Sequence, residues 1–163
     1  MERDDPMELP KRKQNRLSHY DYSQNGAYFI TVCTANRNKI LWNPVGADTI
    51  RPKTVPLSNI GKIVEQGILQ MADHYQNVAV DHYCIMPDHM HLILRIAADA
   101  DGRMISAPTV SVIVGQMKRW VSKEVGYSVW QKSFIDRVIR NESGYRAAWN
   151  YIESNPYVFD EKQ

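Results

Sequence analysis

The sequence predicts an α+β domain on a ferredoxin-like antiparallel sheet, ordered β-α-β-β-α-β, with helices on one face and an added C-terminal helix. Three observations lead to this prediction. Strand-like and helix-like segments follow each other in that order, no internal repeat is present, and 163 residues suit one domain. Residues 1–17 are basic and contain two prolines, so we expect an N-terminal arm followed by a single domain over 18–163.

The first half of the chain contains one strand and one helix with clear local signals. The segment 27–35 is rich in β-branched and aromatic residues, which favour a strand. A helix is expected after Ser58 or Asn59, either of which suits the position before a first turn. Apolar residues then recur at helical spacing from Ile60 to Met71, which predicts one amphipathic stripe.

The second half continues with two adjacent strands, a helix and a short strand. The strands are expected at about 77–86 and 88–96, joined by a short Met-Pro-Asp turn. Apolar residues at helical spacing predict a helix at about 109–124, and a strand-like stretch follows at about 134–140. These four segments complete the expected sheet and its two connecting helices.

The chain ends in a third expected helix, at about 142–154, bounded by Pro156. Its apolar stripe places Tyr151 on the flank of the helix rather than in the core. Asn155 lies one turn further, on the same side as Tyr151. From the residues alone, Tyr151 could equally be an ordinary boundary tyrosine, and Asn155 a residue that caps the helix.

Composition indicates a folded, intracellular protein. Hydrophobic residues make up 44% of the chain, no apolar run is long enough to span a membrane, and the first residues lack the apolar segment of a secretory signal. The two cysteines, Cys33 and Cys84, fall in strand-like segments and are expected to be free thiols. We therefore expect a cytoplasmic protein.

Basic residues are gathered in a few places, although the net charge is only +2. Such groups are most often a solvated surface, and the alternative is contact with phosphates. The candidates for phosphate contact are Lys11, Arg12, Lys13 and Arg16 in the arm, together with Lys118 and Arg140 in the second half.

A pair of histidines gives the clearest sign of chemistry. In a strand, alternate side chains share a face, so His89 and His91 point one way while Met90 and Leu92 point into the core. Two imidazoles side by side provide two ligands of a metal site, and a third ligand must come from another element. A chance pairing of one surface histidine with another remains the alternative.

Four blocks of the sequence resemble one family closely. The histidine pair lies in Met-Pro-Asp-His-Met-His-Leu-Ile, which matches the His-hydrophobic-His signature of the HUH nucleases. The whole ordered set is similar to the REP-associated tyrosine transposases, within the single-tyrosine HUH transposases. The blocks are residues 16–22 (Arg-Leu-Ser-His-Tyr-Asp-Tyr), 26–34 (Gly-Ala-Tyr-Phe-Ile-Thr-Val-Cys-Thr), 130–140 (Trp-Gln-Lys-Ser-Phe-Ile-Asp-Arg-Val-Ile-Arg) and Tyr151-Ile-x-x-Asn155-Pro156.

This resemblance implies a role for each matching residue. The family's nucleophile falls on Tyr151, carried by the added helix, and its metal-binding pair on His89 and His91. Asn155 occupies the position of a polar residue that, as Gln in some relatives, contributes to the metal site. Asp88 replaces the family's usual Asn before the first histidine; we expect it either to orient His89 or to shape the turn.

The implied activity is cleavage and rejoining of single-stranded or hairpin DNA through a 5′-phosphotyrosine, with Mg²⁺ or Mn²⁺ as cofactor. Aromatic residues such as Tyr20, Tyr22 or Trp130 are candidates for stacking on unpaired bases, with core packing as the alternative. On this view the protein is nucleoid-associated when bound to DNA, as a monomer or a homodimer. Two other functions stay open: an inactive module that binds single-stranded DNA, and a metal-dependent hydrolase that uses water.

Overall fold

The computed structural model describes residues 26–44, 56–97 and 108–160, and within them four strands form one antiparallel sheet in the order β2-β3-β1-β4. The predicted α+β fold is confirmed, and so is the order of its elements. The expected arm at 1–17 lies outside the described residues. The elements are β1 (Gly26–Cys33), a 3-10 turn (Ala35–Arg37), α1 (Asn59–His74), β2 (Val78–Ile85), β3 (His89–Ile96), α2 (Val110–Val125), β4 (Ile135–Ile139) and α3 (Glu142–Asp160).

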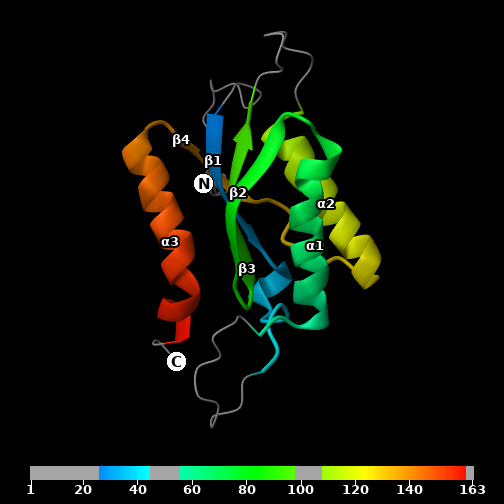
Figure 1. The fold of residues 1–163 in the computed structure, drawn as a ribbon. Coiled ribbons are helices and arrows are strands. Elements are labelled where there is room, and N and C mark those ends of the chain that lie inside the picture. The colour runs from blue at the N-terminus through cyan, green and yellow to red at the C-terminus, as the bar shows by residue number, and fades with distance from the viewer. Residues whose placement is uncertain (1–25, 45–55, 98–107, 161–163) are drawn as a thin grey trace, which may run out of the picture.

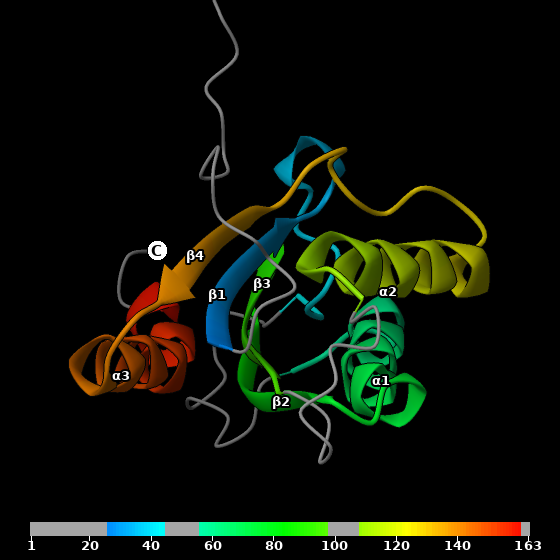
Figure 2. The same ribbon diagram turned by 90° about the horizontal axis from the view of Figure 1, so that it is seen from above.

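The helices lie on both faces of the sheet (Figure 1). Helices α1 and α2 pack side by side over one face, and α3 lies against the other face, as the view from above shows (Figure 2). The larger core fills the space under α1 and α2, and a smaller cluster around Ile93 and Ile152 joins α3 to the sheet. The two faces therefore have different surroundings, and α3 stands apart from the other helices.

Side-chain caps fix where the first two long helices begin. Ser58 accepts a hydrogen bond from the Gly61 amide at 3.0 Å, which confirms the expected start of α1. Thr109 accepts from the Val112 amide at 3.3 Å and caps α2 in the same way. Helix α2 ends at Gly126, whose φ of 91° is a left-handed conformation that glycine adopts without a steric cost.

The expected end of the last helix is wrong. Residues 142–154 were predicted with Pro156 as the boundary, but α3 continues through Pro156 to Asp160. A proline has a φ angle that suits a helix, and its missing N–H removes only the hydrogen bond to the carbonyl four residues earlier. The added turn keeps Asn155 inside the helix, one turn beyond Tyr151.

No helix among the described residues is both long and apolar enough to cross a membrane.

Candidate metal and nucleophile site

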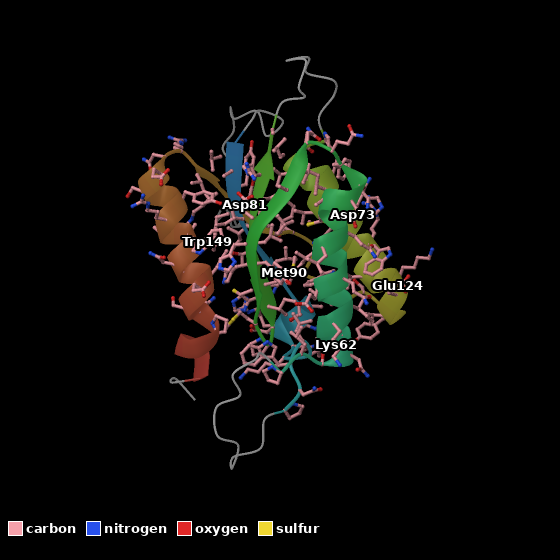
Figure 3. The ribbon with its side chains drawn as sticks, viewed as in Figure 1. Lys62, Asp73, Asp81, Met90, Glu124 and Trp149 are labelled. Carbon is pink, nitrogen blue, oxygen red and sulfur yellow. The ribbon has the colours of Figure 1, made fainter. Side chains whose placement is uncertain are left out.

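Strand β3 sends its two histidines and its apolar residues to opposite faces of the sheet, as the alternating pattern predicted. Met90 and Leu92 are fully buried in the core under α1 and α2. Figure 3 labels Met90 on the sheet and Trp149 on α3, across the sheet from α1. His91 lies opposite Thr31 and His89 opposite Cys33 in the pairing of β3 with β1. Both imidazoles therefore stand on the face that α3 covers.

The two imidazoles converge on one point. Their Nε2 atoms are 3.1 Å apart, and the ring centroids are 4.7 Å apart with the planes nearly perpendicular. Two nitrogen ligands that each bind a divalent ion at about 2.1 Å lie about 3 Å apart. The spacing of the Nε2 atoms of His89 and His91 therefore fits two ligands of one metal ion.

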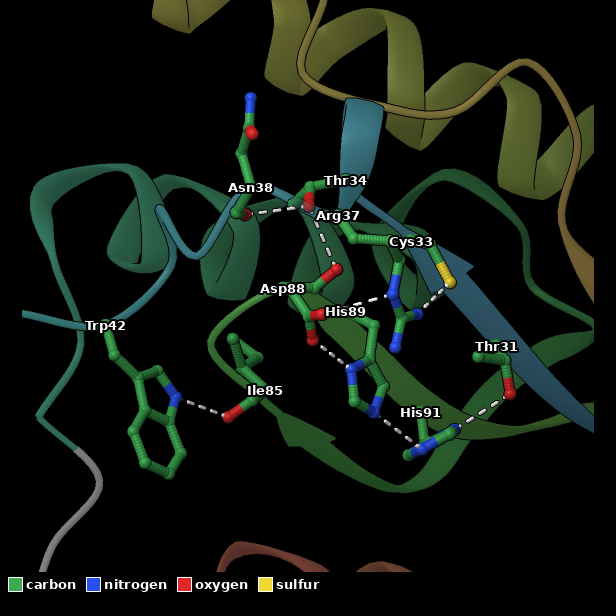
Figure 4. A network of polar contacts seen from close by, with 10 residues as sticks. All are labelled: Thr31, Cys33, Thr34, Arg37, Asn38, Trp42, Ile85, Asp88, His89 and His91. Carbon is green, nitrogen blue, oxygen red and sulfur yellow. Dashed lines mark hydrogen bonds and ion pairs between the residues drawn. The ribbon is translucent and has the colours of Figure 1, made fainter. Parts of the chain in front are cut away.

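The other nitrogen of each ring is held by a neighbouring side chain (Figure 4). His89 Nδ1 lies 2.6 Å from Asp88 Oδ1, and because a carboxylate only accepts, His89 carries its proton on Nδ1. His91 Nδ1 lies 2.8 Å from the Thr31 hydroxyl, which can donate or accept. Partners of this kind fix the ring orientation of metal-binding histidines and leave the Nε2 lone pair for the ion. Of the two roles predicted for Asp88, the structure supports the orientation of His89.

Arg37 extends this network, and sequence patterns did not reveal it. Its Nε donates to Asp88 Oδ2 at 3.1 Å and its Nη1 to Cys33 Sγ at 2.7 Å. The 3-10 turn that carries it has positive φ angles at Asn36 (54°) and Arg37 (56°), an uncommon conformation for residues with a side chain. Thr34 helps to place the turn between β2 and β3, because its hydroxyl donates to the Asp88 carbonyl at 3.0 Å. The 3-10 turn therefore carries Arg37 next to Asp88, the residue that holds His89.

Burial keeps both imidazoles neutral. His91 is only 5% exposed, and burial, with smaller contributions from His89 and Arg37, lowers its pKa to about 3. Burial also lowers the pKa of His89, although Asp88 acts in the opposite direction. A neutral imidazole is the form that binds a metal, so neither ring needs to lose a proton near neutral pH.

The lowered pKa of His91 predicts that the metal-free protein loses stability in mild acid. In the unfolded chain this ring has its ordinary pKa of 6.5 and binds a proton as the pH falls below that value, while the folded ring stays neutral until about 3. The free energy of unfolding should therefore fall by about 2 kcal/mol between pH 7 and pH 5 through this residue. Urea unfolding in EDTA at both pH values measures it, and His91→Gln should remove most of that decrease. An equal decrease in the variant would contradict the assignment.

Helix α3 places Tyr151 beside this pair. Ile152 is buried and anchors the helix to the sheet, whereas the Tyr151 side chain is 50% exposed on the helix flank. Its ring centroid lies 5.2 Å from that of His91 and 5.8 Å from that of Phe29, edge-on to both. The expected approach of the helix-borne tyrosine to the histidine pair is thus present in the structure. The role of each residue stays a prediction.

Asn155, the candidate third ligand, approaches the strand next to the one that carries the histidine pair. Its amide nitrogen is buried without a hydrogen-bond partner among the described residues. The side chain approaches the Cys84 thiol, and burial raises the pKa of that thiol to about 11. Cys84 stands directly opposite His91 in the sheet. Within the described ranges, His, Cys, Asp and Glu residues form no group of three that could hold a metal.

The other predicted site residues are further from this place. The Lys118 ammonium, on α2, donates to the carbonyls of Gln131 and Lys132 at 2.7 and 3.3 Å, and burial lowers its pKa. Arg140 is exposed between β4 and α3. Their contact with DNA stays a prediction, and the four basic residues of the arm lie outside the described residues. Of the two alternatives for Trp130, core packing is confirmed, because its side chain is buried in the core. Tyr20 and Tyr22 lie outside the described residues.

Replacing Asp88 tests its role in holding His89. Asp88→Ala should weaken binding of Mn²⁺ by about 10- to 100-fold, because the His89 ring loses the partner that fixes its orientation. Asp88→Asn keeps an oxygen that can accept from His89 Nδ1 and should restore most of the affinity. Isothermal titration with Mn²⁺ measures both. If Asp88→Ala bound Mn²⁺ as the unchanged protein does, Asp88 would only shape the turn.

The fold and the site define an α+β domain in which paired strand histidines face a tyrosine on a helix. No family model matches the chain. A Haemophilus influenzae protein named "Uncharacterized protein" is 26% identical over 171 residues, which cover 93% of this chain and 92% of that protein. Another protein of that organism, named "Putative REP-associated tyrosine transposase", is 24% identical over 155 residues, covering 86% of this chain and 76% of that protein.

A solved structure shows the same fold. A REP-associated tyrosine transposase bound to a REP hairpin aligns with a TM-score of 0.60 and 21% sequence identity, covering 88% of this chain and 74% of that chain. The resemblance to the REP-associated tyrosine transposases that the four sequence blocks predicted is therefore confirmed. The solved structure shows the fold that this chain shares with that transposase.

Proposed function

We propose that this protein is a metal-dependent tyrosine transposase that cleaves and rejoins single-stranded or hairpin DNA. One observation carries the proposal: the Tyr151 ring lies 5.2 Å from the ring of His91, beside two imidazole Nε2 atoms that converge within 3.1 Å. The likeness to a REP-associated tyrosine transposase bound to a REP hairpin supports hairpin DNA as the substrate class. A water-using hydrolase would have no need of a half-exposed tyrosine at this position.

His89, His91 and Asn155 would hold the metal. When bound, Mg²⁺ or Mn²⁺ would offset the negative charge that develops on the scissile phosphate and align it for attack. Asp88 and Thr31 keep the two imidazoles oriented, and burial keeps both rings neutral. The Asn155 side chain, which approaches Cys84 on the neighbouring strand, would supply its amide oxygen as the third ligand.

Tyr151 would be the nucleophile. Its phenolic oxygen forms a bond to phosphorus, the bond from phosphorus to the 3′ oxygen breaks, and the phenolic proton is passed through solvent to the leaving 3′ oxygen. The products are a 5′-phosphotyrosine and a free 3′-hydroxyl. Attack by a 3′-hydroxyl on the phosphotyrosine reverses these changes and rejoins DNA without an external energy source, because one phosphodiester replaces another.

The surroundings of Tyr151 suit this role. Phe29 meets the ring edge-on from one side and His91 from another, so the ring has limited freedom to turn. Half of the side chain stays open, which allows an unpaired DNA strand to approach the hydroxyl. The burial of Ile152 fixes the height of α3 above the sheet. This chain therefore supplies an oriented nucleophile in an accessible place.

Incubation with hairpin DNA tests the proposal. The unchanged protein is mixed with a 5′-labelled or 3′-labelled DNA hairpin that carries a single-stranded tail, with Mn²⁺ or with EDTA, and separated by denaturing electrophoresis. A covalent protein–DNA adduct on the 3′-labelled strand, formed only with Mn²⁺, is the expected result. Cleavage without an adduct would instead support a hydrolase, and binding without cleavage would support an inactive binding module.

A further inference from the structure

One half of the site face is left largely uncovered by α3. The helix packs mainly on β2 and β3, where Ile152 clusters with Cys84, Met86 and Ile93. Ala27, Phe29 and Ile139, on β1 and β4, also pack against this cluster. On the other half, β1 and the edge strand β4 lie side by side at the end of the sheet. Ile135, at the start of β4, is 50% exposed although it is a large apolar residue within a strand. A sheet face next to the candidate nucleophile is thus available to a ligand.

The strand pairing shows which residues occupy this uncovered half. Directly opposite residues on neighbouring strands share a face. Ile135 pairs with Thr31, which holds His91, and Arg137 pairs with Phe29, which touches Tyr151. Arg137 therefore lies on the same face as the candidate site. Phe29, on β1, stands between it and the Tyr151 ring. The Arg137 side chain is exposed.

A second arginine lies at the other end of this half. Arg37 donates to Cys33 and Asp88, yet half of its side chain is open to solvent. Phe29 and Cys33 are four residues apart, so Arg137 and Arg37 stand roughly 13 Å apart along β1 at about 3.3 Å per residue. The axial rise per phosphate along one strand of B-DNA is about 3.4 Å, so the two guanidiniums can contact different phosphates. The Tyr151–His91 contact lies between them.

The charge of this surface is of one sign. Strands β1 and β4 carry a single acid, Asp136, and it alternates to the opposite face, where its neighbours Phe134 and Val138 pack in the main core. Asp88 already interacts with His89 and Arg37. The uncovered half of the site face therefore offers an apolar centre with a positive group at each end, which complements bases and phosphates of a single strand.

We propose that the uncovered half of the site face, over β1 and β4, binds the single-stranded DNA segment that carries the scissile phosphate. Arg137 and Arg37 contact phosphates on either side of that bond, and the exposed Ile135 packs against a base. This inference rests on the proposed transposase function, because it takes Tyr151 as the point of attack. It adds Arg137, on the edge strand, to the residues that recognise the substrate.

Salt dependence of binding tests the role of Arg137. Fluorescence anisotropy with a labelled single-stranded oligonucleotide is measured over a range of NaCl for the Tyr151→Phe protein, which cannot cleave, with and without Arg137→Gln. Loss of one phosphate contact should weaken binding about five- to tenfold at low salt and reduce the slope of log K against log salt by about 0.7. Arg137→Lys keeps the charge and should restore the slope, and Arg37→Gln should reduce it by a similar amount.

Arg119 provides the matched control. It is an exposed arginine on α2, on the other side of the sheet, and Arg119→Gln removes the same charge there. Binding by Arg119→Gln should stay within about twofold of the parent. If Arg137→Gln and Arg119→Gln gave the same affinity and slope, the proposed DNA surface would be overturned, even if the unchanged protein forms the covalent adduct. If Arg137→Gln alone weakened DNA binding but the unchanged protein formed no covalent adduct, the DNA-binding surface would be supported. The proposed transposase chemistry would then be rejected.

Discussion

Replacing Tyr151 by phenylalanine is expected to abolish both the covalent adduct and the cleavage of hairpin DNA. The change removes one oxygen, the atom that would form the bond to phosphorus, and it leaves the ring in contact with Phe29 and His91. Phenylalanine has no oxygen at that position that could attack phosphorus instead. We therefore expect a loss of at least about 100-fold in the rate of cleavage, with DNA affinity retained. Denaturing electrophoresis with Mn²⁺ and anisotropy binding measure the two quantities.

Tyr145 offers a control on the same helix. Its hydroxyl donates to Asp81 at 2.8 Å, which ties it to β2 rather than to the histidine pair. Tyr145→Phe should leave the adduct unchanged, and it should cost more stability than Tyr151→Phe because Asp81 loses a hydrogen bond. Thermal unfolding of the two variants checks the second point. If the adduct still formed in Tyr151→Phe and disappeared in Tyr145→Phe, the nucleophile would be Tyr145, six residues earlier on the same helix.

Local periodicity explains why much of the fold and part of the site could be predicted. The alternation of His89, Met90 and His91 fixes which side chains face the core, because successive residues of a strand point to opposite faces. The capping signal at Ser58 marks the start of α1 for a similar reason: the hydrogen bond is made to a residue only three positions away. Such features depend on neighbours in the sequence, so the sequence reveals them directly.

The features that escaped prediction depend on residues far apart in the chain. The hydrogen bond between Thr31 and His91 spans sixty residues and requires the register of β1 with β3. The exposure of Arg137 next to Phe29 depends on the pairing of β4 with β1, which no single segment encodes. For Trp130 the sequence could not decide between stacking on a base and packing in the core. Its burial in the core depends on residues distant in the chain.

His89→Ala should abolish metal-dependent cleavage while the fold is kept. The substitution removes one of the two Nε2 ligands and leaves His91, whose ring still stacks on Phe29 at 5.2 Å. A single imidazole with an amide holds a divalent ion poorly, so Mn²⁺ affinity should fall by at least about 100-fold and the cleavage rate with it. Isothermal titration with Mn²⁺ and adduct formation at a fixed Mn²⁺ concentration measure the two effects.

His74→Ala is the matched control, because His74 is exposed at the end of α1 and its ring hydrogen-bonds to the Gln70 carbonyl of the same helix. It should bind Mn²⁺ and form the adduct as the unchanged protein does. Circular dichroism then separates two explanations for an inactive His89→Ala protein. A native spectrum with lost Mn²⁺ binding identifies a ligand, since the ring stands on the sheet face outside the main core. A spectrum of an unfolded chain would show that the His89–Asp88 contact is structural, and the metal would then need other ligands.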